Sequence, residues 1–312
     1  MQEKELYDLA IIGGGPAGVT AGIYAARKKL KTVIITDNWG GQSMVSDDIQ
    51  NWIGYAHIPG AELAKKLEEH LLEYATDTVH IDYPNKANTV NKDVSGLFTI
   101  KTEDDKLYTA KTLLVVTGAT RRKLPAQNAE DFEHKGLTYC ASCDGPLFSG
   151  RDVIVIGGGN AGFETAAQLL AYAKSVTLFE YGDKFAADEV TVEKLKKNEN
   201  FKALTNAQVT EVLGENFVDA VKYKDTKTGE EHMLETGGIF VEIGMVPNTG
   251  LVKDIIELDP YNRIIVDHQT QKTSTEGAWA AGDCTDNIYH QNSIAMGDAV
   301  KALEDIYAYL KT

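Results

Sequence analysis

The residues best suited to chemistry are two cysteines in the middle of the chain, Cys140 and Cys143, which Asp144 follows directly. Two cysteines within one helical turn can close a short disulfide, and a helix N-terminus at this point would lower the pKa of one thiol. Asp144 is a candidate proton donor or acceptor for the departing thiolate, although a carboxylate here can also serve as a helix cap or turn residue. The pattern predicts a redox-active dithiol with these three residues as its catalytic group.

The same cysteines could instead be half of a zinc site. A closed zinc site needs four ligands, and the rest of the 312-residue chain offers only Cys284 and seven scattered histidines. Neither a second C-x-x-C nor a histidine pair at metal-binding spacing is present, so we expect no metal site. Cys284 has no partner at a useful spacing and is expected to be a buried, inert thiol.

A glycine-rich repeat surrounds the cysteines in the sequence. Residues 8–22 read DLAIIGGGPAGVTAG and residues 152–166 read DVIVIGGGNAGFETA, with a constant offset of 157 − 13 = 144. Each copy runs from an apolar stretch through a glycine turn into an alanine-rich helical stretch, and a β-rich run follows at 32–36 and at 176–180. This is a βαβ unit used twice, so we predict an α/β fold with two Rossmann-like dinucleotide-binding domains.

Both glycine fingerprints have the spacing that binds a pyrophosphate. In the first, Gly13 permits the tight turn, Gly15 lets the backbone approach the phosphates, and Gly18 allows close packing of helix on strand. The helix N-terminus then faces the negative charge. The other candidates in the two loops are Pro16 and Ala17 in the first copy, and Gly157, Gly159, Asn160, Ala161, Gly162 and Glu164 in the second.

The second strand of the second copy ends at Glu180, which lies 180 − 157 = 23 residues after Gly157. An acid there accepts hydrogen bonds from the ribose 2′-hydroxyl and repels a 2′-phosphate. No arginine follows it and the nearest cation is Lys184, so the site favours NADH over NADPH; a solvated surface glutamate is the alternative. In the first copy the equivalent residues are Thr36 and Asp37, a pattern closer to FAD binding.

Further segments favour FAD on the first copy. Gly282 and Asp283 close a late strand, where an aspartate can hold the ribityl hydroxyls while the following helix N-terminus faces the flavin. A second glycine loop includes Gly41 and Gln42, and His290 could approach the flavin. Glycine loops and strand-end aspartates are also common turn chemistry, and a plain loop histidine is equally compatible with the sequence.

Two short joints, at 120–125 and 247–250, indicate where the chain passes between domains and could act as hinges. We expect residues 1–120 plus 248–312 to form a discontinuous FAD-binding domain, and residues 121–247 to form an inserted pyridine-nucleotide-binding domain that carries the dithiol. Periodicity further predicts helices at 61–74 and 293–310 and strands at 98–102, 107–110, 113–116, 208–213, 220–223, 239–243, 264–266 and 278–281. The apolar side of the last helix is expected to consist of Ile294, Val300, Leu303, Ile306 and Leu310.

The composition narrows the partners and the compartment. The net charge is 31 − 46 = −15, so nucleic-acid phosphates should repel the chain. We find no basic amphipathic helix for an anionic membrane, no apolar run of spanning length and no signal peptide. Three cysteines make no disulfide framework, which favours a reducing, cytoplasmic compartment.

In these motifs the chain resembles the low-molecular-weight thioredoxin reductase family over essentially its whole length. GGGPAG, GGQ, NWIG, VTGA, CASCDG, GGGNAG and AGDC occur in the family's order. Within the family it is most similar to the reductase portion of the alkyl hydroperoxide reductase flavoprotein, through CDGPLF, GGGNAGFE, GMVPNT and AGDCT. The N-terminal thioredoxin-like domains of that flavoprotein are absent from this sequence.

The resemblance implies FAD on the first and last segments, a pyridine nucleotide on the inserted one, and a homodimer. It also implies that Cys143 faces the flavin, that Cys140 attacks the disulfide of a partner protein, and that Asp144 does acid–base work. The matched segments add candidates for FAD contacts, namely Asn51, Thr117, Gly118, Ala119, His290, Gln291 and Asn292, and for NAD contacts, namely Ile243 and Gly244.

Departures from the family pattern leave the electron donor open. NADPH-using members carry a basic His-Arg-Arg-type segment where this chain has Phe179 to Gly182, and His290 and Asn292 replace parts of the common Arg-Gln-Ala pattern. We expect an FAD-dependent reductase that passes electrons from NADH to a thioredoxin-, glutaredoxin- or peroxiredoxin-type protein. The alternatives are a ferredoxin-fed thioredoxin reductase that does not use NAD(P)H, and a flavin-bound redox sensor.

Overall fold

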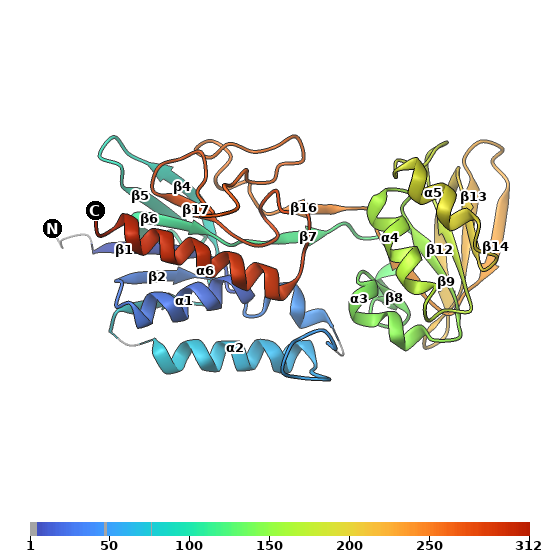
Figure 1. The fold of residues 1–312 in the computed structure, drawn as a ribbon, viewed down its shortest axis with the longest axis horizontal. Helices are drawn as coiled ribbons and strands as arrows, with labels where there is room; N and C mark the ends of the chain where they lie inside the picture. The colour runs from blue at the N-terminus through green and yellow to red at the C-terminus, as the bar shows by residue number, and fades with distance from the viewer. Residues whose placement is uncertain (1–4, 47–48, 76) are drawn as a thin grey trace. The chain divides into compact units, whose positions relative to one another are not determined.

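The structure is a computed structural model that describes residues 5–46, 49–75 and 77–312. Contacts between Cα atoms divide the chain into two units, the first made of 1–45, 58–120 and 246–312 and the second of 46–57 and 121–245. Both are α/β units with a parallel sheet, and the second is inserted into the first, as the repeat predicted (Figure 1). The segment 46–57 is grouped with the inserted unit, whereas the sequence placed it in the first.

The first unit is built on a sheet in the order β3-β2-β1-β6-β5-β4, with β17 also paired to β6. The pairs β3–β2, β2–β1, β1–β6 and β6–β17 are parallel, and β6–β5 and β5–β4 are antiparallel. Helix α1 packs between α2 and α6 (Figure 1). The elements are β1 (Leu6–Ile12), α1 (Pro16–Arg27), β2 (Thr32–Ile35), the 3-10 helix η1 (Gly41–Val45), α2 (Gly60–Tyr74), β3 (Val79–Asp82), β4 (Ala87–Lys92), β5 (Phe98–Thr102), β6 (Leu107–Val115), β17 (Ala278–Ala280) and α6 (Asn292–Tyr309).

Two strand predictions in this unit were wrong. The segments 107–110 and 113–116 were expected as separate strands, but β6 is continuous, because its first half pairs with β5 and its second half with β1. The hydroxyl of Thr112, which interrupts the apolar pattern, is satisfied by the carbonyl of Asp8 at 2.6 Å. The segment 264–266 forms isolated bridges at Ile264 rather than a strand.

The packed face of α6 also differs from the predicted one. Ile294, Val300 and Leu310 are only partly buried, and the buried residues are Ala295, Asp298, Ala299, Ala302, Leu303 and Ile306. The neighbouring helix α1 is itself rich in alanine and glycine. Small side chains on both helices let the two backbones approach closely, which a search for large apolar residues does not detect.

The second unit has an all-parallel sheet in the order β11-β10-β9-β15-β8 and a separate antiparallel sheet, β12-β13-β14. Side chains alternate along β9, so that Val153 and Val155 join the core with α4, and Ile154 and Ile156 join the core with the antiparallel sheet. The elements are η2 (Ala129–Phe132), β8 (Leu137–Thr138), α3 (Ala141–Asp144), η3 (Gly145–Phe148), β9 (Asp152–Ile156), α4 (Asn160–Leu169), β10 (Ser175–Phe179), α5 (Glu189–Lys196), β11 (Phe201–Leu204), β12 (Ala207–Gly214), β13 (Val218–Asp225), β14 (Glu231–Glu235) and β15 (Ile239–Val241).

The segments that connect the two units are short strands. β7 (Ala119–Arg121) and β16 (Met245–Pro247) pair as a two-stranded sheet where the chain enters and leaves the inserted unit. Within the described part of the chain, no helix combines the length and apolarity that crossing a membrane requires.

Candidate active site

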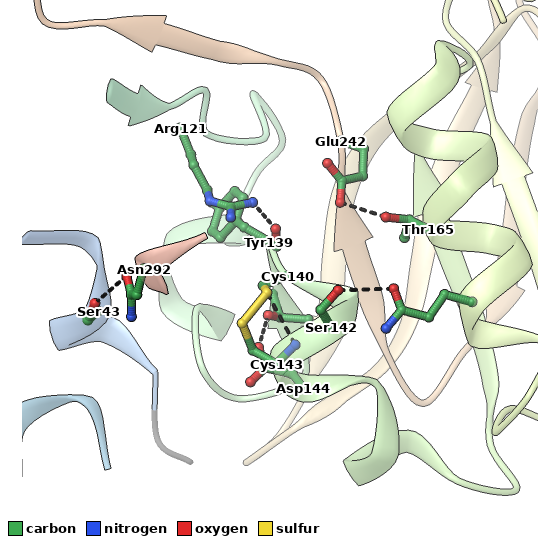
Figure 2. Close-up of a disulfide and its surroundings, with 12 residues drawn as sticks. Ser43, Arg121, Tyr139, Cys140, Ser142, Cys143, Asp144, Thr165, Glu242 and Asn292 are labelled. Carbon is green, nitrogen blue, oxygen red and sulfur yellow. Dashed lines mark hydrogen bonds between the residues drawn. A yellow bond between two sulfur atoms is a disulfide. The ribbon is translucent and has the colours of Figure 1, made fainter. Parts of the chain in front are cut away.

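The cysteine pair is closed as a disulfide in the inserted unit (Figure 2). The Cα atoms of Cys140 and Cys143 lie 5.3 Å apart, and both residues are partly buried. Cys140 is the N-cap of the short helix α3, and its sulfur accepts a hydrogen bond from the backbone N–H of Cys143 at 3.2 Å. After reduction, the same N–H would stabilise a thiolate on Cys140, because hydrogen bonding to a charged form favours it.

Asp144 lies at the end of α3, and the hydroxyl of Thr138 donates a hydrogen bond to its carboxylate (Figure 2). Its side chain does not cap the following helix η3. The N-cap position of α3 belongs to Cys140, so the capping alternative for Asp144 receives no support from this geometry. One residue separates Thr138 from Cys140, so the same short segment holds the carboxylate and one of the sulfurs.

The two glycine turns have nearly the same geometry. Gly13 and Gly157 have φ angles of +120° and +124°, in the region that favours glycine. A Cβ on Gly18 would lie 1.9 Å from the carbonyl oxygen of Gly13, and one on Gly162 would lie 1.8 Å from that of Gly157. The contacts are those the fingerprint requires for a tight turn with a helix packed against it.

Both helices that follow the turns begin without a side-chain cap. Gly15 is the N-cap of α1 and Gly159 that of α4, and neither helix has a capping hydrogen bond from the N-cap side chain. A Cβ on Gly159 would meet no atom of the described residues within 4 Å. Uncapped N–H groups beside open space suit the phosphates of a dinucleotide, and the helix dipole favours the negative charge.

Glu180 is bound to the second glycine turn rather than solvated. Its Oε2 accepts a hydrogen bond from the N–H of Gly158 at 2.7 Å, and its Oε1 accepts one from the N–H of Gly182 at 2.6 Å. These bonds fix the carboxylate at the carboxyl end of β10. In the first unit Thr36 takes the equivalent place, where its hydroxyl donates to the carbonyl of Asn38 at 2.6 Å.

Most residues expected to contact FAD lie at one edge of the first unit's sheet. Because β1, β2, β6 and β17 are parallel, their carboxyl ends meet at that edge. The candidates there are Gly13, Gly15, Pro16, Ala17 and Gly18 after β1, Thr36 and Asp37 after β2, Thr117 and Gly118 after β6, and Gly282 and Asp283 after β17.

Side-chain contacts join further candidates to this edge. The amide of Gln42 donates to the carbonyl of Ala119, and the hydroxyl of Ser43 donates to Oδ1 of Asn292 at 3.1 Å (Figure 2). Gln291 is the N-cap of α6, next to Asn292. Ser43 was not among the predicted residues, although its position directly after the second glycine loop was a usable signal.

His290 and Asp283 form a possible ion pair in the first unit. The Nδ1 of His290 lies 3.4 Å from Oδ1 of Asp283. This nitrogen is buried and lacks the geometry of a hydrogen bond to any described residue. The structure thus brings together the aspartate and the histidine that the sequence proposed for the flavin.

The other candidates have varied surroundings. Asn51 is exposed and belongs to the segment grouped with the inserted unit, so it is not placed in the same unit as the other FAD candidates. The side chain of Asn160 accepts from the N–H of Asp188 at 2.8 Å, which ties the start of α5 to that of α4. Four candidates for the pyridine nucleotide lie on α4 or directly after β15, namely Ala161, Glu164, Ile243 and Gly244.

Glu242 is a charged residue that the sequence prediction missed. It follows β15 directly, and its Oε1 accepts a hydrogen bond from the hydroxyl of Thr165 on α4 at 2.8 Å (Figure 2). Burial raises the pKa of the Glu242 carboxyl, with a further contribution in the same direction from Glu164, while the Thr165 hydroxyl and Arg121 lower it. An acid inside the apolar run that ends in Ile243 was the available signal.

Cys284 is fully buried, as expected, and its thiol lies within hydrogen-bonding distance of the Val115 and Ala281 carbonyls. Burial raises the pKa of this thiol to about 11, so it stays protonated and unreactive at neutral pH. Among the residues that the structure describes, no three His, Cys, Asp or Glu side chains lie together as metal ligands would.

Comparisons with known proteins agree with this geometry. A family model described as pyridine nucleotide-disulphide oxidoreductase matches residues 7–299. The chain is 39% identical over 308 residues to an NADH dehydrogenase of Bacillus subtilis (strain 168), covering 99% of this chain and 59% of the relative. It is 40% identical over 309 residues to an alkyl hydroperoxide reductase of Staphylococcus aureus (strain MRSA252), covering 99% of this chain and 60% of the relative. The chain therefore spans about three fifths of these two relatives.

Among solved structures, thioredoxin reductase from Streptococcus pyogenes MGAS5005 is 35% identical with a TM-score of 0.88, and the match covers 98% of both chains.

Proposed function

The chain belongs to the pyridine nucleotide-disulphide oxidoreductase family, as its motifs indicated, and from this premise we propose that it is an FAD-dependent disulfide reductase. Electrons pass from NADH through FAD to the Cys140–Cys143 disulfide, and from there to a thioredoxin-, glutaredoxin- or peroxiredoxin-type protein. The observation that carries the proposal is that this disulfide is built into the same unit as the second dinucleotide fingerprint.

The residues of the first unit fit FAD. The uncapped N-terminus of α1, with the N–H groups of Ala17 and Gly18, suits the pyrophosphate, and Asp283 at the same sheet edge suits the ribityl hydroxyls. When bound, FAD would supply a two-electron carrier between the nicotinamide and the disulfide. Residues 1–120 with 248–312 are the proposed FAD-binding domain, and residues 121–247 the proposed pyridine-nucleotide-binding domain.

The residues of the second unit fit NADH. The N-terminus of α4 suits the pyrophosphate, and the fixed carboxylate of Glu180 suits an unphosphorylated adenosine ribose. The name NADH dehydrogenase of a relative that is 39% identical supports the same donor.

The dithiol chemistry balances within the chain's own residues. Two electrons and two protons open the S–S bond to two thiols, with Asp144 as the proposed group that exchanges protons with the dithiol. The thiolate of Cys140 then attacks the partner's disulfide, and one partner sulfur leaves as a thiolate. Cys143 next attacks the sulfur of Cys140, which releases the dithiol form of the partner and restores the Cys140–Cys143 disulfide.

The partner and the setting are part of the proposal. The names of two similar proteins, an alkyl hydroperoxide reductase and a thioredoxin reductase, support a peroxiredoxin- or thioredoxin-type partner. A homodimer and a reducing cytoplasmic location accord with the family resemblance and with the small number of cysteines. The net charge of −15 favours a protein partner over nucleic acid.

Anaerobic titration with NADH tests the donor. The FAD-loaded protein should lose its yellow colour as NADH is added, and then reduce a thioredoxin-type protein in steady state. A protein that stays yellow with NADH but is bleached by reduced ferredoxin would be a ferredoxin-fed reductase instead. Bleaching by NADH without turnover of any disulfide protein would point to a redox sensor.

Replacing Glu180 by serine should weaken the preference for NADH. The carboxylate repels a 2′-phosphate, and two like charges a few ångströms apart near a surface repel by a few kcal/mol. The ratio of kcat/KM for NADH to that for NADPH should therefore fall by at least about tenfold. Asp183→Ser is the matched control, because it removes the same charge from an exposed position in the same loop. Equal effects of the two variants would mean that Glu180 acts only through the general charge of the loop.

A further inference from the structure

The hydrogen-bonded pair Thr165–Glu242 lies where the second unit's sheet meets α4 (Figure 2). Thr165 is 8% exposed and faces the sheet from α4. Glu242 follows β15 directly, so its side chain starts at the carboxyl edge of the sheet. A partly buried carboxyl costs free energy unless its surroundings compensate it, so the pair calls for an explanation.

The internal repeat shows that the fold does not need this pair. A Cβ on Gly157 would lie 2.3 Å from the carbonyl oxygen of Glu242, and a Cβ on Gly13 would lie 2.3 Å from that of Val116. Glu242 is therefore the counterpart of Val116. By the repeat offset, 165 − 144 = 21, Thr165 is the counterpart of Ala21.

In the first unit both counterparts are apolar and buried, with Ala21 at 0% and Val116 at 5% exposure. The same strand–turn–helix contact is thus made there without a polar group. A hydroxyl and a carboxyl in the second unit add nothing that the turn requires, so we look for their purpose in a ligand.

The strand order indicates which part of a dinucleotide passes Glu242. From β9 the chain goes through α4 to β10 on one side, and it later returns on β15 on the other side of β9. Ligands of doubly wound sheets bind at the carboxyl edge, across the point where the strand order reverses. If Glu180 at the end of β10 holds the adenosine ribose, the other half of the dinucleotide extends toward the end of β15, where Glu242 lies.

One oxygen of Glu242 is available to such a ligand. Oε1 is occupied by Thr165, and among the described residues no donor reaches Oε2. In Figure 2 Oε2 points away from Thr165 and from α4. The hydrogen bond to Thr165 fixes the carboxyl plane, so the direction of the second oxygen is fixed as well.

We propose that Glu242, oriented by Thr165, binds the carboxamide of the nicotinamide ring through Oε2 and so fixes the rotation of the ring. The carboxamide N–H₂ is a donor that matches a carboxylate oxygen. This inference rests on the proposed use of NADH and names a residue that holds the reacting end of that donor. The raised pKa of Glu242 supports it, because a carboxyl that is easily neutralised is less costly to desolvate when the ring covers it.

Binding of two ligands to the FAD-loaded protein tests the proposal. The first is tetrahydronicotinamide adenine dinucleotide, which keeps the carboxamide but cannot transfer hydride. The second is ADP-ribose, which keeps both riboses and the pyrophosphate but lacks the nicotinamide. Calorimetric titration of the natural protein, of Glu242→Gln and of the double variant Thr165→Ala/Glu242→Val gives the affinities.

The double variant copies the apolar pair of the first unit and should therefore fold. It should bind the dinucleotide analogue about tenfold to a hundredfold more weakly, as expected for the loss of a hydrogen bond to a charged group, and should bind ADP-ribose as the natural protein does. Glu242→Gln keeps an acceptor and should lose less. A thermal unfolding midpoint no lower than that of the natural protein would support the view that the fold does not need the pair.

Two results would overturn the inference alone: unchanged binding of the dinucleotide analogue to the double variant, or an equal loss of affinity for ADP-ribose. The second would mean that the pair shapes the site or contacts a ribose. If the natural protein binds neither ligand, the proposed NADH site itself is wrong, and the inference falls with it.

Discussion

The Cys143→Ser variant should lose the reduction of protein disulfides while its bound flavin is still reduced by NADH. Without Cys143 no disulfide is present to accept the electrons, and serine cannot form a bond that replaces it. Steady-state reduction of a thioredoxin-type protein should fall by at least about 10³-fold, as when other enzymes lose a covalent group. Anaerobic bleaching of the flavin by NADH should be unchanged, because nothing in that step requires the dithiol.

The matched variant Cys140→Ser separates the roles of the two sulfurs. In Cys143→Ser the remaining Cys140 thiolate keeps its hydrogen bond from the backbone N–H at position 143, a contact of 3.2 Å in the disulfide form. It should attack the partner's disulfide and stay in a mixed disulfide, because no second thiol can release it. Non-reducing electrophoresis should show this adduct, and Cys140→Ser should give little of it. The reverse result would exchange the assigned roles, and retained turnover in either variant would contradict the dithiol mechanism.

The sequence predicted the parts of the fold that depend on local pattern. Two copies of a strand, a glycine turn and a helix at an offset of 144 residues were sufficient to predict two doubly wound units, one inserted into the other. The requirement is local and strict, because Gly13 and Gly157 must adopt positive φ and the following helices must pack tightly. Such patterns leave an unambiguous trace in the residue types.

Features that depend on distant contacts were predicted less well. The continuity of β6 depends on partners in two different strands, and the buried face of α6 depends on the small residues of α1. Glu242 was missed because it acquires its meaning only when β15 is placed beside β9 and opposite Thr165. None of these relations is visible in the spacing of residues along one segment.

Replacing Gly162 by alanine should destabilise the second unit and abolish its nucleotide binding. The added Cβ would lie 1.8 Å from the carbonyl oxygen of Gly157, which is a backbone atom and cannot rotate away. The start of α4 would have to move off the sheet, with a cost of about 3 kcal/mol, the upper end of the usual range for overpacking. Hydrogen exchange of the amides in β9, β10 and α4 should report the loss of stability, and titration with ADP-ribose the loss of binding.

Gly159→Ala is the matched control, and it should separate the two reasons for glycine in this loop. A Cβ there meets no described atom within 4 Å, and the residue has φ of −86°, which alanine adopts readily. Stability should therefore change by less than about 1 kcal/mol, the usual cost of alanine at an N-cap. The methyl group would nevertheless occupy the space through which a pyrophosphate reaches the N–H groups of α4, so ADP-ribose should bind at least about tenfold more weakly. Full ADP-ribose affinity in Gly159→Ala would contradict this assignment, because it would mean that the phosphates do not approach the turn at Gly159.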